Sequence, residues 1–325
     1  MSSAVLELIY RDIASDMLEV EAEIRAVLES PVPDIASLLE VSGRYGGKRM
    51  RPALVFLVAR ESGGVCEGHA RLGAVVELIH LATLVHDDVI DVATMRRRQE
   101  TVNVRHGNYE AVLLGDIIFS RAIHLLARLG NRRALLALTQ AVSTVCEGEI
   151  LQNRHRQDPD LTETTYYTII SGKTAELYAA ATGLAAHLAG AADGVVEAFA
   201  LCGLKLGIAF QIIDDCLDVA GEEAQVGKSL GTDLRNGKMT LPLLILREQA
   251  DEATKALLRR VILGQEDAGG VALLNDALRS SGALEEAVKR AEAHVAEGLL
   301  AVRSACGRDS LALAAVGRYV LERKL

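Results

Sequence analysis

The chain has 325 residues and a mass of 34.8 kDa, enough for one large domain or two ordinary ones. Half of the residues are apolar, aromatics make up 3% with no tryptophan, and the net charge is −9 at pH 7. This charge argues against a general nucleic-acid binder, which needs a basic face, and the five prolines are too few for a turn-rich β fold. Alanine and leucine, which lose little side-chain freedom on a helix, dominate the apolar content. We therefore expect an all-α protein.

Helical periodicity runs nearly end to end, with short breaks at glycine, proline and asparagine. In chain order, the expected helices span about 2–30, 35–42, 51–62, 69–94, 109–128, 131–155, 162–172, 174–191, 193–220, 240–249, 252–264, 270–280, 283–305 and 309–323. No break is long enough to be an interdomain linker, and no internal repeat is visible. The pattern predicts a single domain over residues 1–325, built as one large helix bundle whose helices after about residue 250 cover it.

The first cluster of acidic residues ends the expected helix 69–94. Asp87 and Asp91 are four residues apart and therefore share one helix face, with Asp88 about a quarter-turn away. A lone motif of this kind is more often a solvated face, but here the preceding turns are almost entirely apolar. Carboxylates that end a buried helix repel one another and need a cation. The neighbouring His86 could suggest a His/Asp metal phosphohydrolase, but it has no partner histidine cluster.

A second cluster repeats this spacing in the expected helix 193–220. Asp214 and Asp218 are again four residues apart, with Asp215 beside them. Two such triads facing each other across a bundle would form an all-oxygen cage suited to Mg²⁺. Because Mg²⁺ is usually held by a few carboxylates plus substrate phosphates, the pattern predicts a diphosphate or similar anion as ligand.

Basic residues near the expected turns supply charges for such an anion. Gly46 and Gly47 precede Lys48, Arg49 and Arg51 at the start of a helix, where backbone N–H groups also attract anions. Further basic positions follow the first triad, follow a glycine at 172, or lie in the glycine-rich loop 221–238: Arg96, Arg97, Arg98, Lys173, Lys228 and Lys238. Each alone would more often be a solvated charge, but their clustering beside two acidic triads favours an anion site.

Five motifs occur in the order found in the trans-isoprenyl diphosphate synthases: GGKRMRP, HDDVID followed by RR, GKTAEL, FQIIDD and GKSLGTDLRNGK. Over about residues 43–242 the chain resembles this polyprenyl synthetase family, and above all its long-chain octaprenyl diphosphate synthases. The resemblance implies one isoprenoid-synthase-type helix bundle around a deep central cavity, usually as a homodimer. It also implies head-to-tail condensation of isopentenyl diphosphate onto an allylic diphosphate, with farnesyl or geranylgeranyl diphosphate as primer.

The resemblance assigns roles to individual residues. Two or three Mg²⁺ ions would be held by Asp87, Asp91 and Asp214, with Asp88, Asp215 and Asp218 secondary. The allylic diphosphate would be bound by Arg96, Lys173, Thr174, Gln211, Lys228 and Lys238. The allylic cation would be stabilised by dipoles from Lys173, Thr174 and Gln211. Isopentenyl diphosphate would be bound by Lys48, Arg51, His80 and Arg97. The family usually has glycine where this chain has Arg98, which puts only the local loop shape in doubt.

Product length should depend on the helix face beneath Asp87. Ala82 and Thr83 lie one turn deeper and are small, and Ile79 follows at two turns. One turn of about 5.4 Å is comparable to one isoprene unit, so a tunnel there would accept several units. We expect a hexaprenyl to decaprenyl product, with octaprenyl favoured, as for a quinone side chain. Alternatively, another helix near Leu138 closes the pocket, which would make the enzyme a farnesyl or geranylgeranyl diphosphate synthase.

Other functions stay open at this point. A terpene cyclase could use the paired carboxylates but would not need a second diphosphate site, and a noncatalytic subunit would typically lose one triad. A pure prenyl-diphosphate binding module would leave the Lys173, Thr174 and Gln211 group without purpose. The N-terminus lacks a basic segment and carries Glu7, so no signal peptide is expected, and no apolar run suggests a membrane span. Five cysteines without CxxC spacing predict reduced core thiols in a cytoplasmic protein.

Overall fold

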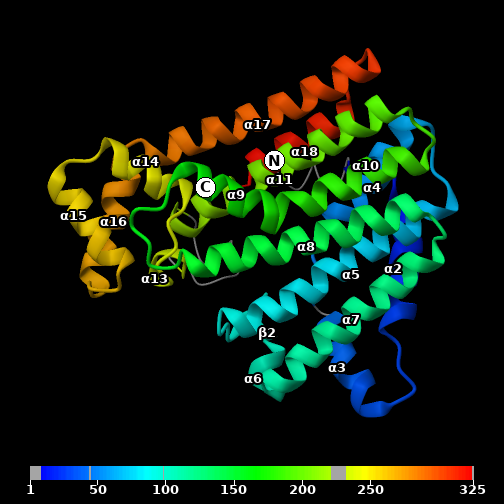
Figure 1. Cartoon of the computed structure of the whole chain (residues 1–325), viewed down its shortest axis with the longest axis horizontal. Coiled ribbons are helices and arrows are strands. Elements are labelled where there is room, and N and C mark those ends of the chain that lie inside the picture. Colours follow the sequence, from blue (N-terminus) through cyan, green and yellow to red (C-terminus); the bar gives the residue numbers. More distant parts are fainter. Residues whose placement is uncertain (1–8, 44, 98, 221–231, 324–325) are drawn as a thin grey trace. The chain divides into compact units, whose positions relative to one another are not determined.

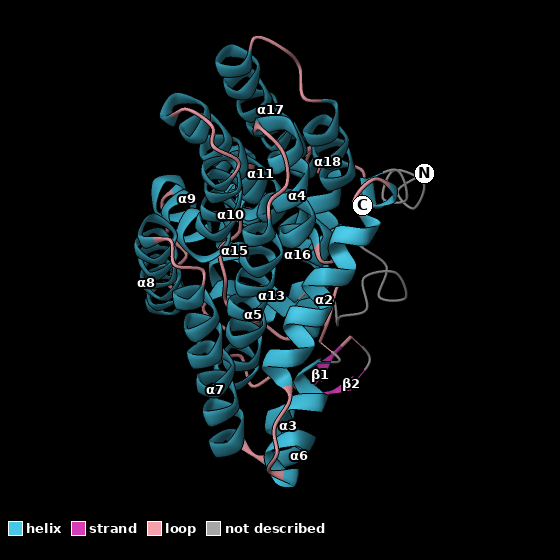
Figure 2. Ribbon diagram, turned by 90° about the vertical axis from the view of Figure 1, so that its right-hand side faces the viewer, coloured by secondary structure: helices cyan, strands magenta, loops and turns pink. Residues whose placement is uncertain are grey.

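A computed structural model describes residues 9–43, 45–97, 99–220 and 232–323. The prediction of an all-α fold is confirmed, because helices make up nearly all of the regular structure. The exception in the described ranges is a hairpin of two two-residue strands, β1 (Met95–Arg96) and β2 (Gln99–Glu100), drawn in magenta in Figure 2.

The chain divides into two compact units. The first comprises the residues up to Thr139 together with Ala180–Ala200, and the second comprises Gln140–Ala179 together with the residues from Leu201 onward. Each unit contains one of the two aspartate triads. The single domain predicted from the sequence stays a prediction.

The first unit is built around helix α5, which packs against α2, α4 and α7 (Figure 1). Its own helices are α2 (Ala14–Leu28), α3 (Pro33–Gly43), α4 (Met50–Ser62), α5 (Glu67–Ile90), α6 (Val102–His106) and α7 (Asn108–Arg128). Parts of α8 (Arg132–Arg154), α10 (Glu176–Leu188) and α11 (Asp193–Ala220) also belong to it. In α4 every residue from Met50 to Ala59 is buried except Arg51. This partly exposed arginine therefore interrupts an otherwise buried, apolar stretch of α4.

The second unit contains the remaining parts of α8, α10 and α11. Its other helices are α9 (Glu163–Ile170), the π-helix η1 (Ser171–Ala175), α13 (Thr232–Arg235), α14 (Leu241–Gln249), α15 (Glu252–Ile262), α16 (Ala268–Ser280), α17 (Ala283–Cys306) and α18 (Leu311–Leu321). Side-chain oxygens of Thr162, Asp251, Asp267 and Ser310 accept backbone N–H bonds at the starts of α9, α15, α16 and α18. Such N-caps satisfy donors that a helix start otherwise leaves unpaired, which explains why these helices begin there.

Several expectations differ from the structure: the helix expected over 2–30 is interrupted by a turn at residues 12–13, and α6, α13 and the β1–β2 hairpin lie where no helix was expected. Two differences bear on the site. The helix expected over 69–94 ends at Ile90, because Asp91 caps it and Val92 has a φ of 51°, which a helix cannot accommodate. The break expected at residue 173 is absent, because α9, η1 and α10 follow one another without interruption. The segment Ser171–Ala175 is a π-helix, whose wider turn continues the helix through the position where a break was expected. Gly172 therefore allows close packing rather than ending a helix. A Cβ atom at this position would lie 3.0 Å from the backbone carbonyl oxygen of Thr144.

Helices α8 and α11 are long and apolar enough to cross a bilayer by length and composition alone. Core helices of soluble proteins share this property, and 61% of the most apolar α11 window is buried. The prediction that no segment spans a membrane therefore stays a prediction. None of the five cysteines, all in the described ranges, forms a disulfide; Cys202 and Cys216 are buried as expected, whereas Cys66 and Cys146 are exposed.

Candidate active site

The first aspartate motif lies at the C-terminal end of α5. The backbone N–H of Asp91 donates to the carbonyl of Asp87 over 2.8 Å, so these residues are one helical turn apart as predicted, and both side chains are partly exposed. Asp88 is different because its side chain is only 2% exposed. Its Oδ1 accepts from Nε and Nη2 of Arg96 at 2.8 and 2.7 Å. Asp87 and Asp91 are therefore less buried than Asp88, which fixes Arg96.

The backbone around this motif is strained. Arg49, Val92 and Arg97 have φ values of 47°, 51° and 50°, and Gln157 alone shares this feature among the described non-glycine residues. A left-handed conformation costs about 1–3 kcal/mol for such residues, and a β-branched side chain such as that of Val92 is the least suited to it. The strain persists only because surrounding contacts impose it, which is common at functional sites.

His80 lies on α5, two turns before Asp87, in a strongly positive environment. Burial lowers its pKa well below the ordinary value, and the positive charges of Arg51, Arg96, Arg97 and Arg49 lower it further. The imidazole is therefore neutral at pH 7 and can donate or accept a hydrogen bond. A neutral histidine among several guanidinium groups suits a multivalent anion such as a diphosphate. The structure thus brings together three of the four residues predicted for isopentenyl diphosphate: Arg51, His80 and Arg97.

The glycine pair before Lys48 makes room for these charges. A Cβ atom on Gly47 would lie 2.3 Å from Nη2 of Arg97, so a larger residue at this position would displace the end of the Arg97 side chain. Arg49 is used within the fold, because its Nε lies 2.7 Å from Glu21 and its Nη1 lies 2.9 Å from the buried Glu77. This ion-pair arrangement joins the start of α4 to α2 and α5.

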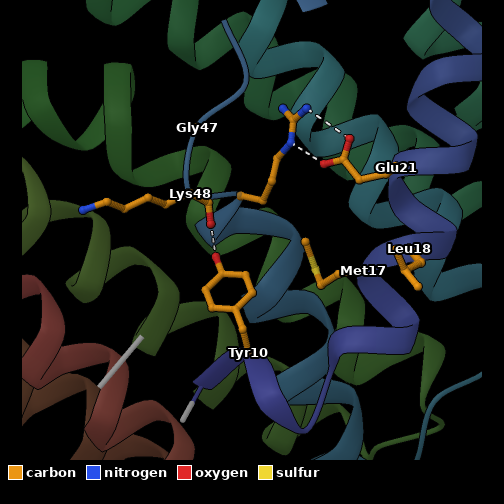
Figure 3. Close-up of a pocket in the computed structure, with 7 residues that line it drawn as sticks. Tyr10, Met17, Leu18, Glu21, Gly47 and Lys48 are labelled. Carbon is orange, nitrogen blue, oxygen red and sulfur yellow. Dashed lines mark hydrogen bonds and ion pairs between the residues drawn. The ribbon is translucent and has the colours of Figure 1, made fainter. Parts of the chain in front are cut away.

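Lys48, the fourth predicted residue, borders a surface pocket of about 380 Å³. The pocket is lined by Tyr10, Met17, Leu18, Glu21, Gly47, Lys48 and Arg49. Figure 3 shows the Tyr10 hydroxyl donating to the backbone carbonyl of Lys48, whose side chain extends away from Met17 and Leu18. The N-terminal segment therefore anchors the backbone of the glycine-rich turn.

The residues predicted to set product length lie beneath the first motif. Ala82 and Ile79 are buried in α5, and the partly exposed Thr83 donates its hydroxyl to the carbonyl of His80 over 2.8 Å. The whole of α5 carries no phenylalanine, tyrosine or tryptophan. None of these three bulky residue types therefore lies on α5 in the turns beneath Asp87.

The second aspartate motif lies in α11 and has other partners. Asp214 Oδ1 accepts from Nη2 of Arg323 at 3.1 Å, and the Arg323 guanidinium lies 4.3 Å from the centre of the Phe210 ring. Asp218 accepts the backbone N–H of Asp233 over 3.0 Å, at the start of α13. Asp214 remains partly exposed, whereas Asp218 takes part in holding α13.

Asp215 is buried and belongs to a chain of hydrogen bonds. The Tyr166 hydroxyl donates to its Oδ2 over 2.6 Å, and Nε2 of Gln211 donates to its Oδ1 over 2.8 Å. The other end of the Gln211 amide, Oε1, accepts from the Thr174 hydroxyl over 2.8 Å. Burial, with the negative charge of Asp233, raises the pKa of Asp215 to about 8, although the bonds from Tyr166 and Gln211 act in the opposite direction. The predicted residues Thr174 and Gln211 thus contact each other, and Asp215 orients them.

Thr174 and Lys173 occupy the π-helix η1, which packs closely against α8. A Cβ atom on Gly148 of α8 would lie 2.6 Å from the backbone nitrogen of Lys173, so glycine is required for this contact. The Lys173 side chain forms an ion pair with Glu149. A π-helix shifts backbone carbonyls out of the regular hydrogen-bond pattern, and such bulges occur frequently at functional sites. This geometry suits the predicted use of the Lys173 carbonyl as a dipole.

The remaining predicted cations lie near the glycine-rich loop. Lys238 forms an ion pair with Asp233 at 3.4 Å. Lys228 and Arg98 lie outside the described residues.

The aspartates fit a hard divalent cation by their chemistry, because Asp87, Asp91 and Asp214 present carboxylate oxygens that are partly exposed. Within the described ranges, no group of three or more His, Cys, Asp or Glu side chains forms a complete metal cage.

Sequence reasoning missed three side chains that contact the predicted residues: Tyr166 on Asp215, Arg323 on Asp214, and Glu149 on Lys173. None lies within a recognised motif. Because Tyr166 and Arg323 are 49 and 109 residues from their partners, spacing along the chain gave no signal for them.

Comparisons with known proteins agree with this geometry. The family described as "Polyprenyl synthetase" matches residues 33–278, more than half of the chain. Octaprenyl diphosphate synthase of Escherichia coli is 39% identical over 301 residues, covering 92% of each chain. A short chain isoprenyl diphosphate synthase of Methanothermobacter thermautotrophicus is 36% identical over 286 residues, covering 86% of this chain and 87% of its own. A Caulobacter crescentus polyprenyl synthase, solved with calcium and isoprenyl diphosphate, is 33% identical with a TM-score of 0.93, covering 98% of each chain.

The motifs, the all-helical fold and these similarities agree with one another over almost the whole length. The chain belongs to the polyprenyl synthetase family, has the isoprenoid synthase fold, and is a trans-prenyltransferase with long-chain synthases among its relatives.

Proposed function

We propose that the protein condenses isopentenyl diphosphate head to tail onto a farnesyl or geranylgeranyl diphosphate primer and makes a long all-trans polyprenyl diphosphate, with octaprenyl as the expected product. The observation that carries this proposal is the cluster of arginine side chains around the neutral His80, next to the Asp88–Arg96 ion pair. A cyclase ionises one diphosphate and has no use for a second anion site. Two-substrate prenyl transfer requires one.

In the proposed reaction, Lys48, Arg51, His80 and Arg97 bind isopentenyl diphosphate. Asp87, Asp91 and Asp214 would hold two or three Mg²⁺ ions, which would supply Lewis-acid neutralisation of the departing diphosphate. Arg96, Lys173 and Lys238 would add positive charge to the same leaving group. Guanidinium and ammonium groups strengthen such binding through charge-assisted hydrogen bonds.

The allylic C–O bond breaks, and the electron deficit forms at the allylic carbons. The Thr174 hydroxyl donates a hydrogen bond to Oε1 of Gln211, so the lone pairs of the Thr174 oxygen can face positive charge. The Gln211 carbonyl oxygen keeps a second lone pair for the same use. These groups stabilise charge as dipoles and make no covalent bond. The double bond of isopentenyl diphosphate then forms the new carbon–carbon bond, and its C2 proton passes to the released diphosphate.

The long product is supported by the small residues Ala82 and Thr83, by Ile79, and by the lack of aromatic residues on α5. The alternative is a farnesyl or geranylgeranyl diphosphate synthase, for which a bulky side chain from another helix would close the tunnel. A quinone side chain is the use we propose for the product. Five cysteines without a disulfide suit a reducing compartment, and we propose a cytoplasmic location.

The test is incubation with Mg²⁺, labelled isopentenyl diphosphate and farnesyl diphosphate, with product length read by chromatography. A ladder of products ending near eight units is expected. Products that stop at three or four units would keep the reaction but overturn the length. Consumption of farnesyl diphosphate to a hydrocarbon without incorporation would establish a cyclase instead.

We also propose that the enzyme acts as a homodimer. On α7, Tyr109, Val112 and Leu113 are 76%, 42% and 44% exposed, and their spacing places them on one helix face. An apolar stripe of this kind suits contact with a second copy. Light scattering should give twice the chain mass, and Leu113→Glu should shift it toward the monomer. A monomeric wild-type enzyme with full activity would contradict this proposal.

A further inference from the structure

Tyr166 has a buried hydroxyl group that donates a hydrogen bond to Asp215. The residue is 3% exposed in α9, and its Oη lies 2.6 Å from Oδ2 of Asp215, which is itself 4% exposed. Burial, together with the charge of Asp215, raises the pKa of Tyr166 well above its ordinary value, so the phenol keeps its proton and acts as the donor. The motifs that define the family-like pattern do not include this tyrosine.

The carboxyl group of Asp215 has two oxygens, and each accepts from a different donor. Tyr166 takes Oδ2, which leaves Oδ1 for Nε2 of Gln211. An amide has a donor end and an acceptor end, so an amide whose Nε2 donates to a carboxyl oxygen must direct Oε1 the other way. In this structure Oε1 is directed to the Thr174 hydroxyl, at 2.8 Å.

We propose that Tyr166 is a positioning residue for prenyl transfer: it holds Asp215 so that the Gln211 carbonyl and the Thr174 hydroxyl point their oxygens toward the allylic cation. This inference rests on the proposed function and adds a residue to it. Without the hydroxyl, Oδ2 would lose its donor in a buried place and the carboxyl group would be free to rotate. Among the described residues, the Gln211 amide donates to Asp215 and accepts from Thr174, so a carboxyl group that can rotate would no longer fix which end of the amide faces Thr174.

The adjacent Tyr167 provides a matched control in the same helix. It is partly exposed, its ring packs 5.5 Å from that of His294, and its hydroxyl interacts with Arg290 rather than with Asp215. Tyr167→Phe removes the same atom as Tyr166→Phe from a neighbouring position outside the hydrogen-bond chain. A general effect of losing a tyrosine hydroxyl in α9 would appear in both variants.

The experiment compares steady-state incorporation of isopentenyl diphosphate by the wild type, Tyr166→Phe and Tyr167→Phe. For Tyr166→Phe we expect kcat to fall about 10- to 100-fold, the usual effect of losing an outer partner of an active-site group. The KM for isopentenyl diphosphate should not change, because its site uses other residues. Tyr167→Phe should keep the wild-type kcat. A urea unfolding midpoint for each variant verifies that it is folded.

A double-mutant cycle separates positioning from a purely structural role. Gln211→Met keeps the side-chain size but removes the amide dipole, so in that background Tyr166→Phe should cost no further kcat. Equal fold losses in both backgrounds would overturn the inference, since Tyr166 would then act independently of Gln211. An active wild type with an equally active Tyr166→Phe variant would overturn it too, while leaving the proposed function intact. A wild type that incorporates no isopentenyl diphosphate would overturn the proposed function itself.

Discussion

The two aspartate motifs have the same spacing but different surroundings. In both, the middle aspartate is buried: Asp88 in the first and Asp215 in the second. Asp88 forms an ion pair with the cationic Arg96. The backbone that follows it is strained at Val92 and Arg97, and Arg49, Arg51 and Arg97 lie close to the neighbouring His80. Asp215 is held by two neutral donors, Tyr166 and Gln211, inside regular helices.

This difference shows how one sequence pattern serves two kinds of chemistry. A carboxylate paired with a guanidinium group organises positive charge, which suits binding of diphosphate. A carboxyl group held by neutral donors organises dipoles, and burial without a cation raises its pKa, here to about 8. The first motif is therefore suited to anions, and the second is suited to orienting groups around a developing cation.

The largest expected effect comes from removing one exposed aspartate of each motif. Asp87→Ala combined with Asp214→Ala should abolish Mg²⁺-dependent turnover, because both proposed sets of metal ligands lose a carboxylate. The fold should survive, since both side chains are partly exposed. Turnover is measured by incorporation of labelled isopentenyl diphosphate, and circular dichroism serves as the control. Retained activity would rule out the metal assignment, and with it the proposal that both motifs bind the same metal ions.

Stability should distinguish the two buried aspartates. Arg96→Met should lower the free energy of unfolding by about 3–5 kcal/mol, because it leaves Asp88 buried without a compensating charge. Tyr166→Phe should cost about 1–3 kcal/mol, the usual effect of losing one partner of a buried hydrogen bond. Urea unfolding measures both. Adding Asp88→Leu to Arg96→Met should recover most of the loss, and equal costs for the two single variants would contradict the comparison.

The first motif is also expected to determine product length. Ala82→Phe should shorten the product markedly, because the aromatic ring would close the space one turn beneath Asp87. Ala82→Val provides a graded control with a smaller intended effect, and chromatography of the products measures both. An unchanged product length with Ala82→Phe would refute the tunnel along α5.

The smallest effect is a difference in pH dependence, measured on the metal-free protein. His80 has a lowered pKa in the folded state, so the unfolded chain binds its proton first and stability falls as pH drops below about 6.5. Asp215 has a raised pKa, so the folded state keeps its proton and stability falls as pH rises from about 4 to about 8. His80→Asn and Asp215→Asn should therefore change the slope in opposite directions. Slopes that change in the same direction would contradict the contrast between the two environments.

The all-α fold and most helix boundaries could be predicted from the sequence, because apolar periodicity and turn residues are local signals. The same holds for the spacing of Asp87 with Asp91 and of Asp214 with Asp218, since a helix places residues four apart on one face. The early end of α5 and the π-helix at Ser171–Ala175 were not predicted. Both depend on packing, through the cap at Asp91 and the close approach of Gly148.

The sequence alone determined which functional side chains are present: two acidic triads, a set of basic residues after glycines, and small residues one turn before Asp87. Tertiary structure decided which partner each group has. In the folded chain Arg49 pairs with Glu21 and Glu77, and Arg96 pairs with Asp88. Tyr166 donates a hydrogen bond to Asp215. These pairs join residues from different elements, and their strength depends on burial and geometry, which no local pattern encodes. Identical aspartate motifs thus acquired different electrostatic surroundings only once the chain was folded.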